Sequence, residues 1–310
     1  MGHATYFFTS FLLVSVLNVA KGQPLVPALF IFGDSVVDVG NNNHLLTIVK
    51  ANFPPYGRDF NNHSSTGRFC NGKLATDYTA ESLGFTSYPP PYLNLDVKGT
   101  NLLNGANFAS AASGYYDSTA KLYHTIPLSK QLEHYKESQN ILVGIVGQSN
   151  ASSIISGAIH LNLYALGARR IGVTTLPPMG CLPAAITLFG SGSNECVVRL
   201  NSDAVNFNKK LNTTSQSLQK SLSGLKLVIL DIYQPLYDLV TKPSENGFFE
   251  ARKACCGTGL LETSILCNKK SVGTCANASE YVFWDGFHPS EAANKVLAGD
   301  LLAAGISLIS

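Results

Sequence analysis

Charged side chains are scarce in this sequence, and they are not grouped. Asp, Glu, Lys and Arg make up 14% of the 310 residues, and the formal net charge is only +2. Nowhere do five or six like charges follow one another, whereas nucleic-acid-binding proteins usually carry a concentrated basic surface that neutralises phosphates. The sequence therefore predicts no nucleic-acid partner.

Several motifs that identify other enzyme classes are absent. The sequence has no G-x-S-x-G, which argues against the nucleophile elbow of the α/β-hydrolases, and no H-E-x-x-H, which excludes a zincin-type zinc helix. Residues 67–74 come one residue short of a phosphate-binding P-loop. The mismatch is Leu74, which stands where that loop needs Ser or Thr to bind magnesium, so nucleotide binding is not expected.

A long apolar run is also missing, even at the amino terminus. The apolar stretch of residues 6–20 is shorter than the roughly 20 residues that a membrane-spanning helix needs. Ala20 and Gly22 supply small residues at the −3 and −1 positions of a cleavage site before Gln23. We expect residues 1–22 to be a secretory signal peptide, with no stable membrane anchor, and residues 23–310 to form a single domain.

Cysteines and glycosylation sequons agree with export. Three disulfides and one free thiol are the simplest arrangement for seven cysteines, with the pairing left open. A zinc site among the cysteines of 255–275 is disfavoured, because their spacing is not two CxxC pairs and no histidine lies between them. Six cysteines lie in the second half, at Cys181, Cys196, Cys255, Cys256, Cys267 and Cys275, and Cys70 stands alone. N-x-S/T sequons, typical of a glycoprotein, occur at Asn62, Asn150, Asn212 and Asn277.

Short apolar runs alternate with longer helix-like segments. The apolar runs predict strands at 28–32, 106–109, 170–174 and 225–230. Helical patterns occupy 73–83, 129–145, 152–166, 197–222 and 290–306. This alternation predicts an α/β fold, a doubly wound parallel sheet with helices on both faces.

Two segments at opposite ends of the chain carry residues for nucleophilic catalysis. A serine hydroxyl needs an imidazole to take its proton and a carboxylate to orient that imidazole. Ser35 follows the first predicted strand, at the sheet edge where open α/β folds bind ligands, although Ser at such a position also caps helices. Asp285 precedes His288 on a short Gly- and Pro-bounded loop, so one loop could supply carboxylate and imidazole together.

Taken together, these segments resemble the plant GDSL esterase/lipase family of the SGNH hydrolase superfamily. Residues 28–43 (ALFIFGDSVVDVGNNN) resemble the first block of the family, and 105–110 (GANFAS) the second. The last block is matched by 283–289 (FWDGFHP). Further segments similar to plant members are 66–73, 166–173, 176–181 and 255–259.

The resemblance implies a serine esterase or lipase that hydrolyses small acyl esters or lipids through an acyl-enzyme. Ser35 would be the nucleophile, with Asp285 and His288 as its partners, and the oxyanion hole would use the backbone N–H groups of Ser35 and Gly114, with Gly105 as second choice. The family also implies an SGNH/flavodoxin-like three-layer sandwich, no metal or organic cofactor, and a location in the cell wall or apoplast. The oligomeric state is not indicated.

One block of the family pattern is missing. The third block, Gly-x-Asn-Asp or Gly-x-Ser-Asp after a central strand, should lie between residues 152–157 and 163–170, but roughly 40 residues are lacking there, the length of a strand and its crossover. The loss should force a new strand pairing or leave backbone groups unpaired, at about 1–3 kcal/mol each. Two hypotheses follow: an active ester hydrolase, or a catalytically impaired glycoprotein of the same fold, either a binding protein or a non-functional truncated isoform.

Overall fold

The computed structural model describes residues 23–94, 99–160, 164–258, 262, 267–268, 270 and 274–309. The predicted signal peptide, residues 1–22, lies outside them. Within the described part, the strands are β1 (Ile159–His160), β2 (Arg170–Thr174), β3 (Lys226–Leu230), β4 (Glu250–Ala254) and β5 (Tyr281–Phe283). The α-helices are α2 (Ala75–Ser82), α3 (Asp117–Leu122), α4 (Leu128–Val146), α5 (Gln148–Gly157), α6 (Pro183–Phe189), α7 (Val198–Ser221), α8 (Tyr233–Thr241) and α9 (Glu291–Gly305).

A parallel sheet runs through the middle of the molecule. β2 pairs with β3 along its full length, from Arg170↔Lys226 to Thr174↔Leu230, and β1 pairs with the start of β2. The first apolar run extends this sheet through the parallel bridges Leu29↔Ile159 and Ile31↔Asn107. The spatial order is therefore 106–109, 28–32, β1, β2 and β3, which confirms the predicted α/β class with its parallel sheet.

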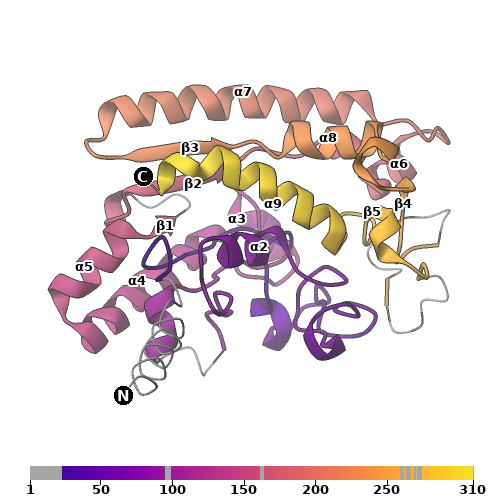
Figure 1. Ribbon diagram of the computed structural model, residues 1–310. Helices are drawn as coiled ribbons and strands as arrows, with labels where there is room; N and C mark the ends of the chain where they lie inside the picture. Colours follow the sequence, from indigo (N-terminus) through magenta and orange to yellow (C-terminus); the bar gives the residue numbers. More distant parts are fainter. Residues whose placement is uncertain are drawn as a thin grey trace, which may run out of the picture.

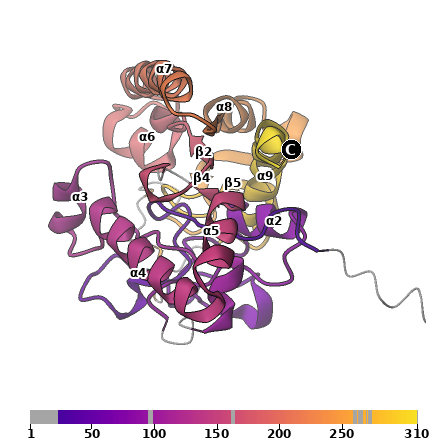
Figure 2. The same cartoon turned by 90° about the vertical axis from the view of Figure 1, so that its left-hand side faces the viewer.

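Alternating side chains of the first apolar run explain why helices cover both faces. Phe30 and Phe32 pack against Tyr135 of α4, with ring centroids 5.2 and 5.6 Å away. Leu29 and Ile31 point to the other face and pack with Leu83, just after α2. Because successive strand residues face opposite ways, an apolar run of this kind needs cover on both sides. Figure 2 shows α3 and α4 on one side of the sheet and α2 and α9 on the other.

The long helix α7 and the last helix α9 complete the layers around β3. Both contact β3, and Figure 1 shows α7 on one side of β3 and α9 on the other. α9 begins after Ser290, whose side chain accepts a hydrogen bond from the Ala293 N–H and so caps the helix. α9 also packs along α2, which brings the carboxyl-terminal part of the chain beside the amino-terminal part.

The helix predicted over 152–166 is wrong in its second half. α5 ends at Gly157, and a side chain there would approach Pro27 Cγ to 2.9 Å. The chain then becomes extended, because Ile159 hydrogen-bonds Ala28 and Phe30 of the first run at 3.3 and 3.1 Å. Sheet pairing therefore overrides the helical pattern, as tertiary contacts often do.

β1 is the new pairing that forms where the third family block is lacking. Its two residues join the first run to β2, but the pairing ends at His160↔Ile171. Further toward the carboxyl ends of the strands, the described residues include no strand between Phe32 and Gly172–Thr174. The central strand is thus replaced only over its first part.

A smaller parallel sheet of β4 and β5 lies at the other end of the molecule, and the sequence analysis did not predict it. Disulfides Cys181–Cys196, Cys255–Cys275 and Cys256–Cys267 surround this end, and Cys70 is free and buried. The prediction of three disulfides and one free thiol is confirmed. None of the described helices combines the length and the apolar character needed to cross a lipid bilayer.

Short 3-10 helices connect these elements. They lie at Asn41–His44, Asn61–His63, Thr100–Asn104, Tyr164–Leu166, Met179–Cys181, Ser244–Asn246, Ala278–Glu280 and Ile306–Leu308.

Candidate active site

Ser35 lies in a tight turn directly after the first apolar run. The turn is closed by the Asp38 N–H, which donates to the Asp34 carbonyl at 3.0 Å, and by the Val36 N–H, which donates to the Asp34 carboxylate at 3.0 Å. Gly33 opens the turn with a φ of 149°, a value that residues other than glycine rarely adopt. The Ser35 side chain is partly exposed at this turn.

Asp285 and His288 lie on the loop that joins β5 to α9. The Trp284 N–H donates to the His288 carbonyl at 2.8 Å, which folds the loop back on itself. Within it, the N–H groups of Phe287 and His288 donate to Asp285 Oδ1 at 2.9 and 3.0 Å. The spacing of three residues thus lets the carboxylate hold the backbone of the loop and still face the imidazole.

The structure brings Ser35, His288 and Asp285 into one chain of hydrogen bonds. His288 Nδ1 lies 2.7 Å from Asp285 Oδ1, and His288 Nε2 lies 2.7 Å from Ser35 Oγ. A carboxylate can only accept, so Nδ1 must carry the proton, and Nε2 of the neutral ring is then an acceptor for the Ser35 hydroxyl. This is the arrangement in which an imidazole can take a proton from serine.

Burial and hydrogen bonding compete at Asp285, which has no exposed surface. Burial raises the pKa of the Asp285 carboxyl, but the imidazole of His288, the Phe287 N–H and the Tyr56 hydroxyl outweigh burial and lower it below its ordinary value. The carboxylate therefore stays ionised at neutral pH, where it can stabilise a positive charge on the imidazole.

Tyr56 is a contact of this group that the sequence analysis missed. Its hydroxyl donates to Asp285 Oδ2 at 2.8 Å, and its side chain is 2% exposed. Burial, followed by the charge of Asp285, raises the pKa of Tyr56, so this hydroxyl remains a donor. The only signal in the sequence is an aromatic residue in a Pro-Pro-Tyr-Gly turn at 54–57, and nothing in that pattern points to an aspartate more than 200 residues away.

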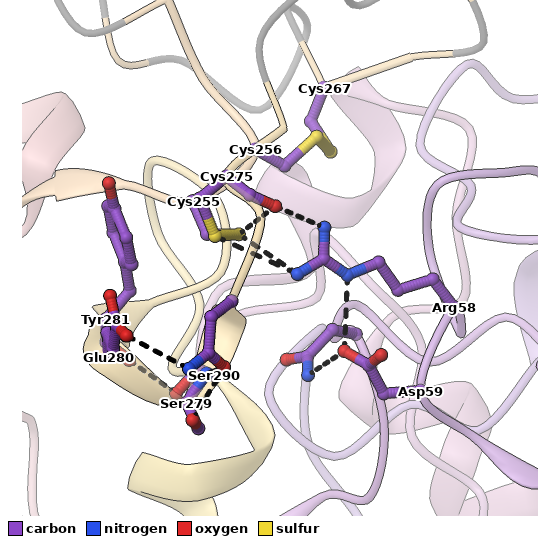
Figure 3. Close-up of a disulfide and its surroundings, with 12 residues drawn as sticks. Arg58, Asp59, Cys255, Cys256, Cys267, Cys275, Ser279, Glu280, Tyr281 and Ser290 are labelled. Carbon is purple, nitrogen blue, oxygen red and sulfur yellow. Dashed lines mark hydrogen bonds and ion pairs between the residues drawn. A yellow bond between two sulfur atoms is a disulfide. The ribbon is translucent and has the colours of Figure 1, made fainter.

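Arg58 connects the turn that carries Tyr56 to a disulfide (Figure 3). Its Nη1 donates to the Cys275 carbonyl at 2.8 Å, and its Nε pairs with Asp59 at 3.2 Å. The guanidinium also lies 5.0 Å from the ring centroid of Trp284, next to Asp285. The Cys255–Cys275 disulfide thus supports, through Arg58, the loop that holds the carboxylate.

Gln131 of α4 holds the backbone on the serine side. Its amide accepts from the Gly33 N–H at 3.0 Å and donates to the Gly33 carbonyl at 2.9 Å, two residues before Ser35. Gln131 is fully buried, so these bonds are shielded from water. A glutamine on a predicted helix carries no sequence signal of such a role.

The buried Asp38 organises the loop that follows Ser35. Its carboxylate accepts from the N–H groups of Gly40, Asn41 and Ala111 at 2.8–2.9 Å. It therefore ties the loop after Ser35 to the segment after the second family block. Burial is the largest influence on this carboxyl and raises its pKa to about 6, although these hydrogen bonds oppose the rise.

The two glycines considered for the oxyanion hole lie in different places. Gly114 lines a cavity of about 420 Å³ together with Gly33 and Asp34, the residues before Ser35. Gly105 instead packs against the backbone of Leu29, at the opposite end of the first run, where a side chain would approach Leu29 O to 2.0 Å. The structure therefore leaves Gly105 distant in the fold from the serine turn.

The remaining predicted positions lie on the surface. Asn62, Asn150, Asn212 and Asn277 are all exposed. In the described part of the chain, no three His, Cys, Asp or Glu side chains are grouped closely enough to hold a metal ion.

Comparisons with known proteins show which family the chain resembles. A family model described as GDSL-like lipase/acylhydrolase matches residues 29–155 and 146–301. In Arabidopsis thaliana, GDSL esterase/lipase At5g22810 is 63% identical over 338 residues, covering 95% of this chain and 93% of the relative. GDSL esterase/lipase APG is 56% identical over 337 residues, covering 96% and 95%.

The lengths of these alignments bear on the missing block. The alignment with the relative of 63% identity extends over 338 residues, which exceeds the 310 residues of this chain. The relative must therefore contain residues that have no counterpart here. This agrees with the absence of the third block from the sequence.

Proposed function

This chain belongs to the GDSL-like lipase/acylhydrolase family, and we propose that it is a secreted carboxylic ester hydrolase in which Ser35, His288 and Asp285 form the catalytic triad. The observation that carries the proposal is the continuous chain of hydrogen bonds from Ser35 Oγ through the imidazole to the buried carboxylate. Asp285 and His288 are close in the sequence, but Ser35 is far from both. The contact between Ser35 and His288 therefore depends on the whole fold.

In the first half of the reaction, Ser35 Oγ attacks the carbonyl carbon of the ester. The hydroxyl proton passes to His288 Nε2, and the ionised Asp285 stabilises the imidazolium that forms. The tetrahedral intermediate collapses when His288 returns this proton to the leaving alcohol oxygen. The products of this half are the free alcohol and an acyl-enzyme ester on Ser35.

The second half reverses these roles with water. His288 takes a proton from a water molecule, whose oxygen attacks the acyl carbon, and the proton then goes to Ser35 Oγ as the acid is released. The negative oxygen formed in both halves would be bound by the N–H groups of Ser35 and Gly114. Each such donor typically contributes about 2.7–4 kcal/mol to the transition state.

Export and glycosylation form part of the proposal. The apolar stretch before Gln23 has the length and cleavage pattern of a signal peptide. Disulfides form and persist mainly in oxidising compartments, and this chain has three. The exposure of Asn62, Asn150, Asn212 and Asn277 leaves each available to glycan transfer. We therefore expect an extracellular glycoprotein of the cell wall or apoplast.

Two assays on the purified protein test the activity. A short-chain aryl ester measures turnover, and a fluorophosphonate measures covalent reaction at an activated serine. Ser35→Ala should abolish labelling and lower kcat/KM by roughly 10⁴-fold or more. Ser153→Ala is the matched control, because Ser153 is exposed on α5 and its hydroxyl donates only to the Ser149 carbonyl in the preceding turn.

The absent third block favours one alternative, a protein that binds without turnover. A folded chain with cooperative thermal unfolding that neither reacts with the fluorophosphonate nor hydrolyses the ester would support this binding role. Labelling that survives in Ser35→Ala would instead place the reactive serine elsewhere and contradict the triad.

A further inference from the structure

The sheet contains a gap beside the triad, and the residues on both sides of this gap line one cavity. β1 joins the first apolar run to β2 only as far as His160 and Ile171. Beyond that point, Phe32 and Gly33 on one side and Gly172–Thr174 on the other line the same cavity of about 420 Å³. This is the position of the central strand that is lacking, so the cavity follows from a feature specific to this chain.

The cavity extends to the residues that flank the reacting groups. Its lining includes Asp34 and Val36, the neighbours of Ser35, and Phe287 and Pro289, the neighbours of His288. Ser35 Oγ and His288 Nε2 lie 2.7 Å apart between these pairs. A molecule in the cavity would therefore have one end next to the serine.

The cavity also passes through the sheet from one face to the other. On the α4 side it is lined by Leu128 and Tyr115. On the opposite side it is lined by Thr79 of α2 and Leu302 of α9. Such a passage suits an elongated ligand, and its volume lies within the range of roughly 300–1,000 Å³ that is usual for ligand sites.

The chemistry of the lining selects the kind of ligand. Among the described lining residues, Asp34 is the one charged side chain, and it lies at the triad end. Leucine, isoleucine, valine and phenylalanine form most of the remainder, including Leu29, Ile159 and Leu230. An apolar chain gains free energy from leaving water in such a site, whereas a polar ligand would lose hydrogen bonds there.

We infer that this cavity binds the acyl chain of the substrate and makes the protein prefer esters of longer acids, such as octanoate, over esters of short acids, such as butanoate. The inference rests on the proposed function of Ser35. The acyl group, rather than the alcohol, is the occupant because it stays bonded to Ser35 in the acyl-enzyme while the alcohol departs. The sheet gap thereby acts as a specificity site.

Chain-length kinetics test this inference. Each methylene that the cavity buries should raise kcat/KM by about fourfold, which corresponds to ~0.8 kcal/mol. p-Nitrophenyl octanoate has four more methylenes than the butanoate, so it should exceed the butanoate by roughly 250-fold if the cavity buries all four, and by roughly fifteenfold if it buries two. In a second pair of substrates, ethyl octanoate should show this preference over ethyl butanoate, whereas octyl acetate should not exceed butyl acetate.

Variants of the lining connect the preference to the cavity. Thr174 lines the cavity at the exposed end of β2, so Thr174→Trp should fill the entrance and lower the octanoate/butanoate ratio by about tenfold. Leu302→Ala enlarges the far end and should move the optimum to longer chains, which provides a second route if Thr174→Trp does not fold. Thr241→Trp, at the exposed end of α8, is the matched control and should leave the ratio unchanged.

A binding assay separates this inference from the proposed function. Ser35→Ala cannot form an acyl-enzyme, yet it should bind a fluorescent polyunsaturated fatty acid, and decanoic acid should displace the probe at far lower concentration than butanoic acid. Hydrolysis without a chain-length preference, or a preference that Thr174→Trp and Leu302→Ala both leave unchanged, would overturn the inference while the triad stands. Chain-length-dependent binding without any hydrolysis would uphold the cavity and overturn the proposed activity.

Discussion

Replacing Tyr56 with phenylalanine removes a single hydroxyl from the surroundings of the triad. That hydroxyl donates to Asp285 Oδ2 at 2.8 Å, and both side chains are buried, so water cannot replace the lost donor. A hydrogen bond to a charged partner typically contributes about 1.5–3 kcal/mol. We expect Tyr56→Phe to lower the free energy of unfolding at pH 7 by about this amount.

The loss should depend on pH in a definite direction. Burial raises the pKa of Asp285, but its contacts, including the one from Tyr56, outweigh burial and lower it below 3.8. A carboxyl with a lowered pKa in the folded state contributes stability above its unfolded pKa, and this contribution is lost as the pH falls through the folded value. The difference between wild type and Tyr56→Phe should therefore be complete at pH 7 and decrease below about pH 4.

The catalytic effect should be smaller than that of losing a triad member. If all of the lost bond energy appeared in the transition state, the rate would fall roughly ten- to hundredfold. Asp285 Oδ1 keeps the N–H groups of Phe287 and His288, so we expect the lower limit, about tenfold in kcat with KM little changed. The acid limb of the rate profile should move to higher pH, because Asp285 loses one of the contacts that lower its pKa and is protonated more readily.

The assay combines urea unfolding with a pH–rate profile on an aryl ester. Tyr92→Phe is the matched control, since it also deletes a tyrosine hydroxyl that donates to a carboxylate, that of the exposed Glu137 at 3.4 Å. The ring of Tyr92 packs against Phe108 in the main core, away from the triad. If Tyr56→Phe lost stability yet kept kcat and the position of the acid limb, Tyr56 would be structural only and the reasoning would be refuted.

Three further predictions concern other parts of the chain. Burial raises the pKa of the Cys70 thiol to about 12, so the native protein should not react with an aromatic disulfide reagent at pH 8. The denatured, unreduced protein should show one reactive thiol. Reaction of the native protein would contradict this burial. Burial likewise raises the pKa of Asp38 to about 6, so folding favours the protonated carboxyl. In urea unfolding, wild type should therefore gain stability relative to Asp38→Asn as the pH falls from 7 to 4. A loss over that range would show that the backbone hydrogen bonds outweigh burial. Protein exported from plant cells should begin at Gln23 by mass spectrometry and lose mass on enzymatic deglycosylation, and a retained 1–22 segment would refute cleavage.

Local sequence patterns predicted the regular elements well where the pattern and the fold agree. The run at 170–174 is β2 as predicted, and the helical pattern of 197–222 differs from α7 by one residue at each end. The pattern over 152–166 failed because Ile159 hydrogen-bonds the first run, which no local signal reveals. β4 and β5 were missed because their residues form a short, partly polar pair beside the disulfides.

For the candidate site, the residue types and their spacing in the chain were sufficient to select Ser35, Asp285 and His288, since each has a recognisable local motif. The same was true of the missing block, which is visible as a shortened interval in the sequence. Whether the three side chains act as proposed remains a prediction that the assays above address.

The sequence by itself determined the parallel α/β class, the number of disulfides and the three residues chosen for the triad, because these depend on periodicity, on cysteine count and on motifs a few residues long. Only the tertiary structure decided how the shortened chain closes its sheet, that Tyr56 and Gln131 support the reacting groups, and that a cavity opens beside Ser35. Those features depend on contacts between segments tens to hundreds of residues apart, whose distances are set by packing and not by any local pattern.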